Sequence, residues 1–170
     1  MADKEFKLVS PLIIEKKGGG NLPRYCTQEG VDNKWNISPP LEWHNVPDQA
    51  KSLALLVQDI DAVDPRGHLV PVTHWVVVNI PPTLKGLPKG FSGKQDELGD
   101  VYSGIEEGLN DWNVKLWNGP KMPNYGDRFE FKLYALDSNK HFDNQVTTEK
   151  LMEAIAGHVV GEAVFIATFG

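Results

Sequence analysis

Two continuous apolar runs near the middle of the chain predict neighbouring strands inside a sheet. The runs cover residues 53–57 and 76–80 and consist largely of leucine, valine and isoleucine. Apolar runs of this length without alternation are typical of strands that are covered on both faces. Pro81 and Pro82 follow the second run and end the second strand.

Apolar and polar positions alternate over residues 128–137, which predicts a third strand. A period of two places successive side chains on opposite faces of a strand, so one face is expected to be buried. The expected buried face consists of Phe129, Phe131, Leu133 and Ala135, and the opposite face of Glu130, Lys132 and Tyr134.

A helix is predicted over residues 147–159. Thr147 or Thr148 can cap its N-terminus, and Leu151 and Ile155 lie on one face of it. Gly157 is a natural stop, because glycine commonly follows the last turn of a helix.

Glycine and proline interrupt the remaining segments. These are an apolar segment at 6–14 with Pro11 inside it, a turn at 18–23, a loop at 36–47 with embedded aromatic residues, and a final strand at 161–170. Residues 84–119 are rich in glycine and predict a long irregular excursion, which in a compact domain is usually functional. The pattern indicates a mostly β fold with a few short helices, in one domain over residues 1–170.

The composition and charge of the chain argue against several classes of protein. The chain has 170 residues, and 17 Lys and Arg against 23 Asp and Glu give a net charge of −6. An acidic protein without a basic patch is a poor binder of nucleic acid. We find no secretory signal and no run near the roughly 18–20 apolar residues that a membrane span requires. Cys26 is the sole cysteine, which favours a reducing compartment and a cytoplasmic location; a catalytic role for this thiol has no basic neighbour to support it.

Polar residues gather where the two apolar runs end and begin. Asp59 and Asp61 follow the first run, and His74 and Trp75 begin the second. In an extended segment the two carboxylates face the same way and need a cation, a proton or a hydrogen-bond network between them. Alternatively, one of them caps the following turn. His74 is either a ligand-binding imidazole oriented by Asp59 or a packed histidine that donates to a backbone carbonyl.

A further candidate segment precedes the third strand. Gly119 and Pro120 predict a stiff turn whose backbone can approach a ligand, and Asp127 and Arg128 open the strand. The alternative is simple turn chemistry with an Asp127–Arg128 surface pair. Known metal, nucleotide and nucleophile motifs are missing from the sequence, so we assign no catalytic residue, metal or cofactor.

Six segments in order resemble the phosphatidylethanolamine-binding protein family, which includes the Raf kinase inhibitor protein. The segments are residues 37–43, 59–65, 73–81, 107–111, 119–137 and 151–163, and they look most like the bacterial and plant-type branch. The resemblance implies a large central β-sheet packed on a smaller sheet with a few short helices. It also implies a small pocket for phosphate-like anions at the end of the large sheet.

Matching the family's motifs to this sequence implies which of its residues form the binding site. The implied ligand-binding residues are Asp59, His74, Gly108, Gly119, Pro120, Asp127 and Phe129, and the implied supporting residues are Asp61, Trp75, Asn110 and Arg128. Asp127 and Phe129 stand where the family usually carries a histidine and a tyrosine. At an effective dielectric constant of about 20, like charges about 4 Å apart cost about 4 kcal/mol. We therefore expect weaker anion binding unless Arg128 neutralises Asp127, and a pocket that prefers an amine, a metal cation or a neutral ligand.

The function expected from these features is binding of a small anionic or lipid-headgroup-like ligand. The family implies an additional regulatory or inhibitory role toward kinases or serine proteases, and peripheral membrane contact stays open. Tyr102, Trp112 and Trp117 in the long excursion are either contacts for such a protein partner or anchors that pack the loop. The alternative is an enzyme that uses Asp59, His74 and Asp127 for acid–base or metal-assisted chemistry.

Overall fold

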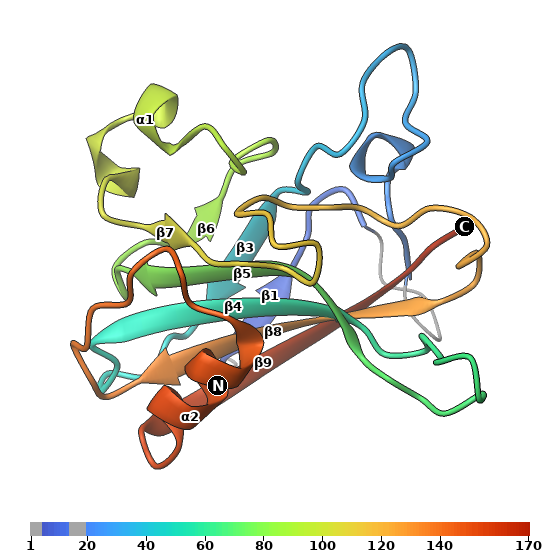
Figure 1. The fold of residues 1–170 in the computed structure, drawn as a ribbon. Coiled ribbons are helices and arrows are strands. Elements are labelled where there is room, and N and C mark those ends of the chain that lie inside the picture. The colour runs from blue at the N-terminus through green and yellow to red at the C-terminus, as the bar shows by residue number, and fades with distance from the viewer. Residues whose placement is uncertain (1–4, 14–19) are drawn as a thin grey trace.

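A computed structural model describes residues 5–13 and 20–170 and has two β-sheets. The large sheet has six strands in the order β2-β9-β8-β4-β5-β7, and the small sheet has three in the order β1-β3-β6 (Figure 1). The strands of the large sheet are β2 (Gly20–Asn21), β4 (Ser52–Asp59), β5 (Val72–Ile80), β7 (Glu106–Glu107), β8 (Arg128–Leu136) and β9 (Val159–Thr168). Those of the small sheet are β1 (Lys7–Val9), β3 (Leu41–His44) and β6 (Gly86–Leu87). The helices are η1 (Arg24–Cys26), α1 (Gln95–Leu98), η2 (Asp100–Tyr102) and α2 (Thr148–Ile155).

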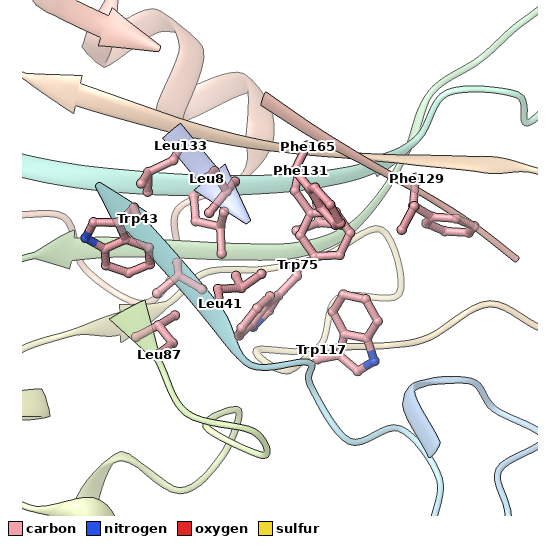
Figure 2. Packing of buried hydrophobic residues seen from close by; sticks show 14 of the residues in the cluster. Leu8, Leu41, Trp43, Trp75, Leu87, Trp117, Phe129, Phe131, Leu133 and Phe165 are labelled. Carbon is pink, nitrogen blue, oxygen red and sulfur yellow. The ribbon is translucent and has the colours of Figure 1, made fainter. Parts of the chain in front are cut away.

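The large sheet lies between two hydrophobic clusters. The first cluster fills the space between the two sheets and is rich in aromatic rings, among them Trp43, Trp75 and Phe131 (Figure 2). The second joins the opposite face of the large sheet to α2 through Val76 and Leu151, among others. Strands β4 and β5 are buried on both faces because they lie between these clusters. The mostly β fold and the two central strands predicted from the apolar runs are confirmed.

Strand β8 has the predicted alternation. Phe129, Phe131, Leu133 and Ala135 all lie in the first cluster, whereas Tyr134 belongs to the second. Lys132 lies on the same outer face as Glu130 and Glu162, with its Nζ atom 3.4 Å and 3.6 Å from their carboxylates. The predicted strand and its face of Phe129, Phe131, Leu133 and Ala135 are confirmed, but Tyr134 on the opposite face is buried as well.

The predicted helix forms as α2, capped by Thr147. The side chain of Thr147 accepts a hydrogen bond from the backbone of Lys150, and Leu151 and Ile155 are buried. Gly157 follows with φ 81°, a left-handed conformation that ends the helix readily in glycine. Strand β9 begins at Val159, two residues before the predicted start of the last strand.

Residues 36–47 were expected to form a loop, and this prediction is wrong at their centre. Strand β3 occupies this segment, with Leu41 and Trp43 buried and Glu42 and His44 exposed. The Trp43 indole donates to the backbone oxygen of Leu84 at 2.6 Å. Neighbouring prolines hid this short alternation. The turn expected at 18–23 is also revised in part, because Gly20–Asn21 pairs with β9, while residues 18 and 19 lie outside the described residues.

The excursion at residues 84–119 contains only the short elements β6, α1, η2 and β7, as its composition predicted. Glu107 of β7, which is 4% exposed, holds it to the sheet. The Glu107 carboxylate accepts hydrogen bonds from the indole of Trp75 (2.7 Å), the hydroxyl of Ser92 (2.5 Å), the backbone of Gly93 (2.7 Å) and the amide of Gln95 (2.8 Å). None of the helices in the described part of the chain has the length and hydropathy to cross a bilayer.

Candidate functional site

A bulge in strand β5 determines where His74 points. Val57 of β4 pairs with Trp75 and Gln58 pairs with Thr73, so His74 is an extra residue between two paired positions. The Thr73 hydroxyl faces α2, 2.7 Å from that of Thr148, whereas the His74 ring lies with the aromatic side chains of the other face. Bulges re-aim side chains in this way and are common beside functional sites.

Asp59 ends strand β4 and is fully buried opposite Phe129 of β8. Its Oδ1 atom accepts a hydrogen bond from the backbone of Asp61 at 2.9 Å. Its Oδ2 atom is buried and has no hydrogen-bond partner among the described residues. Because the chain turns after Asp59, the expectation that Asp59 and Asp61 face the same way along an extended segment is wrong. Asp59, rather than Asp61, caps this turn.

His74 is 1% exposed, and only one of its ring nitrogens is satisfied. Its Nδ1 atom donates to the backbone oxygen of Asn118, while Nε2 is buried without a partner among the described residues. Burial lowers the pKa of His74 to about 4, so the ring is neutral at pH 7 and Nε2 carries a lone pair. The backbone carbonyl therefore orients the ring, and the expected orientation by Asp59 is not found.

Two aromatic rings enclose the imidazole. Trp112 and Phe129 both meet His74 edge to face, with centroid distances of 4.8 Å and 4.9 Å. Phe129 is fully buried, whereas the Trp112 side chain is 41% exposed. Trp112 thus forms the part of the wall between His74 and solvent.

Asp127 completes an acidic cluster with Asp59. It is partly exposed, precedes β8, and interacts electrostatically with both Asp59 and His74. Burial, followed by the neighbouring Asp127 carboxyl, raises the pKa of Asp59 to about 7. The neighbouring negative charge makes Asp59 harder to ionise, in the same direction as burial does.

Arg128 does not neutralise Asp127. Its guanidinium binds the Asp61 carboxylate through two hydrogen bonds of 2.9 Å and 3.0 Å, and its backbone N–H adds a third of 2.8 Å. This arginine lowers the pKa of Asp61. The Asp127–Arg128 surface pair considered from the sequence is therefore replaced by an Asp61–Arg128 pair.

Asn110 organises the loop that carries Trp112. Its Oδ1 atom accepts from the backbone of Trp112 (2.9 Å) and of Val114 (3.1 Å), and its Nδ2 atom donates to Leu116 at 2.8 Å. Asn110 itself is 3% exposed. The predicted supporting residue thus acts by shaping the wall over His74.

Gly119 and Pro120 directly follow Asn118 in the chain. At Gly119 the backbone passes very close to the backbone of Cys26. A Cβ atom on Gly119 would stand 1.8 Å from the backbone oxygen of Cys26, so only glycine fits. The Gly119 N–H donates to the Asn36 side chain at 2.8 Å, and the oxygen of Pro120 accepts from Gln28 at 2.9 Å.

Two of the predicted site residues lie elsewhere. Gly108 packs against Val146 on the α2 side of the sheet, where a Cβ atom would stand 2.5 Å from the Val146 backbone oxygen. Trp75 is buried in the first cluster and donates to Glu107. Both support the strands around the cluster, and a ligand contact by Gly108 stays a prediction.

Two residues at the cluster were not selected as site residues from the sequence. Asn118 contributes a backbone carbonyl, which carries no signal in the sequence, and Trp112 was noted only as an aromatic residue of the excursion. Beside Trp112 lies a groove of about 350 Å³. The residues that line it are Asn36, Ser92, Trp112, Val114, Leu116, Trp117 and Asn118. Both tryptophans line the groove, but Trp117 is only 2% exposed and packs the loop, whereas Trp112 is 41% exposed.

Comparisons with known proteins agree on one family. The family model described as phosphatidylethanolamine-binding protein matches residues 14–170. A UPF0098 protein of Methanothermobacter thermautotrophicus is 38% identical over 150 residues, which cover 88% of this chain and 91% of that protein. A UPF0098 protein of Chlamydia pneumoniae is 30% identical and is covered to 98%, against 96% of this chain.

Solved structures show the same relationship. The crystal structure of a putative phosphatidylethanolamine-binding protein homolog from Chlamydia trachomatis has a TM-score of 0.80 at 30% identity, with 99% of each chain covered. E. coli YbcL, described as a new member of the mammalian family, has a TM-score of 0.78 at 25% identity and covers 97% of this chain and 98% of its own. With the two-sheet fold and the matched segments, these findings show that the chain belongs to the phosphatidylethanolamine-binding protein family.

Proposed function

We propose that this protein binds a small, headgroup-like ligand at the cluster of Asp59, His74 and Asp127, called the acid cluster below. The observation that carries the proposal is the pair of buried atoms without partners, Asp59 Oδ2 and His74 Nε2. Burying a polar atom without a hydrogen bond costs about 1–3 kcal/mol, and such atoms are rare in folded proteins. A ligand that forms hydrogen bonds with both atoms removes this cost, so the two unpartnered atoms are explained if they bind a ligand.

The negative charge of the acid cluster opposes binding of the phosphate-like anion that the family resemblance suggests. Asp127 contributes a carboxylate, and Arg128 is engaged with Asp61. A fully ionised phosphate therefore meets acceptors where it needs donors. We propose that anions bind more weakly here than they do to an Asp127→His variant, by as much as about a thousandfold if the repulsion reaches about 4 kcal/mol.

Titration of the ¹⁵N-labelled protein with phosphorylethanolamine tests the binding function. We expect saturable shifts of amide signals from residues around His74, and at least tenfold weaker binding in a His74→Gln variant. His158→Gln is the matched control, because His158 is an exposed histidine paired with Asp137. Equal affinity of all three proteins, or no saturable shifts in any of them, would remove the acid cluster as the binding site.

A role as an inhibitor of kinases or serine proteases is a finer proposal that the family suggests. The exposed Trp112 beside the groove is the residue that favours a protein contact, since Tyr102 packs on Phe91 and Trp117 is buried. Loss of inhibition on Trp112→Ala, in an assay of a serine protease or kinase that the protein inhibits, tests it. The alternative of an enzyme is not favoured, because membership of the family supports ligand binding.

A further inference from the structure

Two of the three side chains in the acid cluster are closed off from solvent. Asp59 is 0% exposed and His74 is 1% exposed, so a molecule outside the protein reaches neither of them without an opening. We infer that Trp112 is a gate, whose indole ring leaves His74 and moves into the groove beside it to open the acid cluster. This inference rests on the proposed function and adds how the site is entered and closed.

Of the two rings that enclose His74, Trp112 is the one that can move. Phe129 is 0% exposed and belongs to strand β8, where it pairs with Asp59 of β4 on one side and Ala167 of β9 on the other. Trp112 is 41% exposed and belongs to the loop between β7 and β8. An exposed side chain changes rotamer within picoseconds to nanoseconds, whereas a ring packed inside a sheet does not.

No directional bond holds the Trp112 ring in its closed position. Its indole N–H makes no hydrogen bond to any described residue, and the ring meets His74 edge to face at 4.8 Å. An edge-to-face contact contributes a preference of roughly two- to twelvefold. A preference of this size keeps the gate mostly closed and leaves an open position populated.

The backbone on which the ring turns stays in place. The N–H of Trp112 donates to the Asn110 side chain at 2.9 Å. Next to it, the N–H of Asp111 donates to the backbone oxygen of Thr73 at 3.0 Å, and the Asp111 carboxylate accepts from the N–H of Thr73 at 2.8 Å. The gate therefore opens by rotation of one side chain, without breaking the hydrogen bonds that hold the loop.

The groove beside Trp112 offers space for the rotated ring. It has a volume of about 350 Å³ and contains Trp112 in its wall. Sites of about 300 Å³ already hold small-molecule ligands, so there is room for one indole. The apolar part of the lining comes from Val114, Leu116 and Trp117. The indole thus exchanges one apolar surrounding for another, which keeps the hydrophobic cost of opening small.

Reaction of His74 with diethyl pyrocarbonate at pH 7 tests the gate without any ligand, because the reagent modifies only an imidazole nitrogen that it can reach. Peptide mass spectrometry gives the rate for His74 relative to His68, whose side chain is 71% exposed. We expect Trp112→Ala to raise the His74 rate about threefold or more and Trp112→Phe to give an intermediate rate. Trp35→Ala is the matched control, because Trp35 is 56% exposed and does not line the groove. An unchanged His74 rate in Trp112→Ala overturns the inference.

A variant that fills the groove tests where the ring goes. Val114→Trp places a large side chain in the groove wall and leaves the Trp112 ring no room to enter. We expect the His74 rate to fall about threefold or more below that of the unmodified protein, since the open position is lost. Val101→Trp is the control, because Val101 is 63% exposed and lies outside the groove lining. A His74 rate in Val114→Trp equal to that of the control overturns the movement into the groove.

Binding kinetics of phosphorylethanolamine separate the gate from the proposed function. NMR line shapes should show faster association in Trp112→Ala and slower association in Val114→Trp than in the unmodified protein. If the His74 rates change as expected and phosphorylethanolamine binds to none of the proteins, the gate stands and the binding function is removed. Equal association rates in all three proteins, with unchanged His74 rates, remove the gate and leave the binding function intact.

Discussion

Asp59 and His74 respond to the same burial in opposite ways. Burial raises the pKa of Asp59 to about 7 and lowers the pKa of His74 to about 4. Both changes favour the neutral form of the side chain. The Asp59 carboxyl therefore destabilises the fold increasingly as pH rises toward 7, whereas His74 destabilises it as pH falls from about 6.5 to 4. Between about pH 4 and pH 6.5, a rise in pH therefore lowers the stability of the fold through Asp59 and raises it through His74.

Replacing Asp59 by asparagine should stabilise the protein at pH 8. Asparagine keeps the acceptor for the Asp61 backbone and removes the buried charge. A pKa rise from 3.8 to about 7 corresponds to roughly 4 kcal/mol, an upper limit for the gain. Urea unfolding at pH 8 and pH 4 measures it, and the gain should vanish at pH 4, where Asp59 is protonated in the unmodified protein. Asp48→Asn serves as the exposed control, and lower stability of Asp59→Asn at pH 8 would contradict the prediction.

The residues around the acid cluster come from the ends of strands and from one loop that side-chain hydrogen bonds hold in place. The end of β4 supplies Asp59, and the starts of β5 and β8 supply His74 and Phe129. The loop between β7 and β8 supplies Trp112 and the Asn118 carbonyl. This loop has little regular structure, so side-chain hydrogen bonds from Asn110 give it its shape.

Asn110→Ala should loosen this loop and weaken ligand binding. The substitution leaves two backbone N–H groups and one carbonyl without their partners, and a cost of about 2–4 kcal/mol follows if water does not replace them. Differential scanning calorimetry measures the stability, and the phosphorylethanolamine titration measures the affinity. Asn144→Ala, an exposed substitution in another loop, should change neither. Unchanged stability and affinity in Asn110→Ala would show that the loop does not depend on this side chain.

At the scale of the whole molecule, the long excursion depends on one buried carboxylate. Glu107 joins β7 to the segment around Ser92 and to Trp75 in the core. Since charge-assisted hydrogen bonds are the stronger kind, the carboxylate fixes the excursion against the sheet. The acid cluster forms because the end of β4 and the starts of β5 and β8 meet at one end of the large sheet.

Glu107→Gln should destabilise the excursion by about 3 kcal/mol, because an amide turns one acceptor into a donor that faces other donors. Hydrogen exchange should become faster at the Gly93 amide, which donates to Glu107. Glu106→Gln is a matched control on the same strand, since Glu106 is only partly buried. Equal exchange rates in the two variants would argue against Glu107 as the anchor.

The sequence alone determined the two central strands, strand β8 and helix α2, whereas the structure decided that Thr147 rather than Thr148 caps the helix. These elements follow from local periodicity and capping, which neighbouring residues specify. Segment resemblance also identified Asp59, His74, Asp127 and Phe129, which the structure brings together. Strand β3 was missed because Leu41 and Trp43 lie between prolines, and its pairing with β1 and β6 is a non-local property.

Only the tertiary structure decided how the acid cluster works. The bulge that turns His74, the Asn118 carbonyl that fixes its tautomer and the Asp61–Arg128 pair all depend on register and on contacts between distant segments. Burial, and with it the direction of each pKa change, arises only when the two sheets and the loop close around the side chains. A sequence lists ionisable groups, but their charge and their unpaired atoms depend on what surrounds them in space.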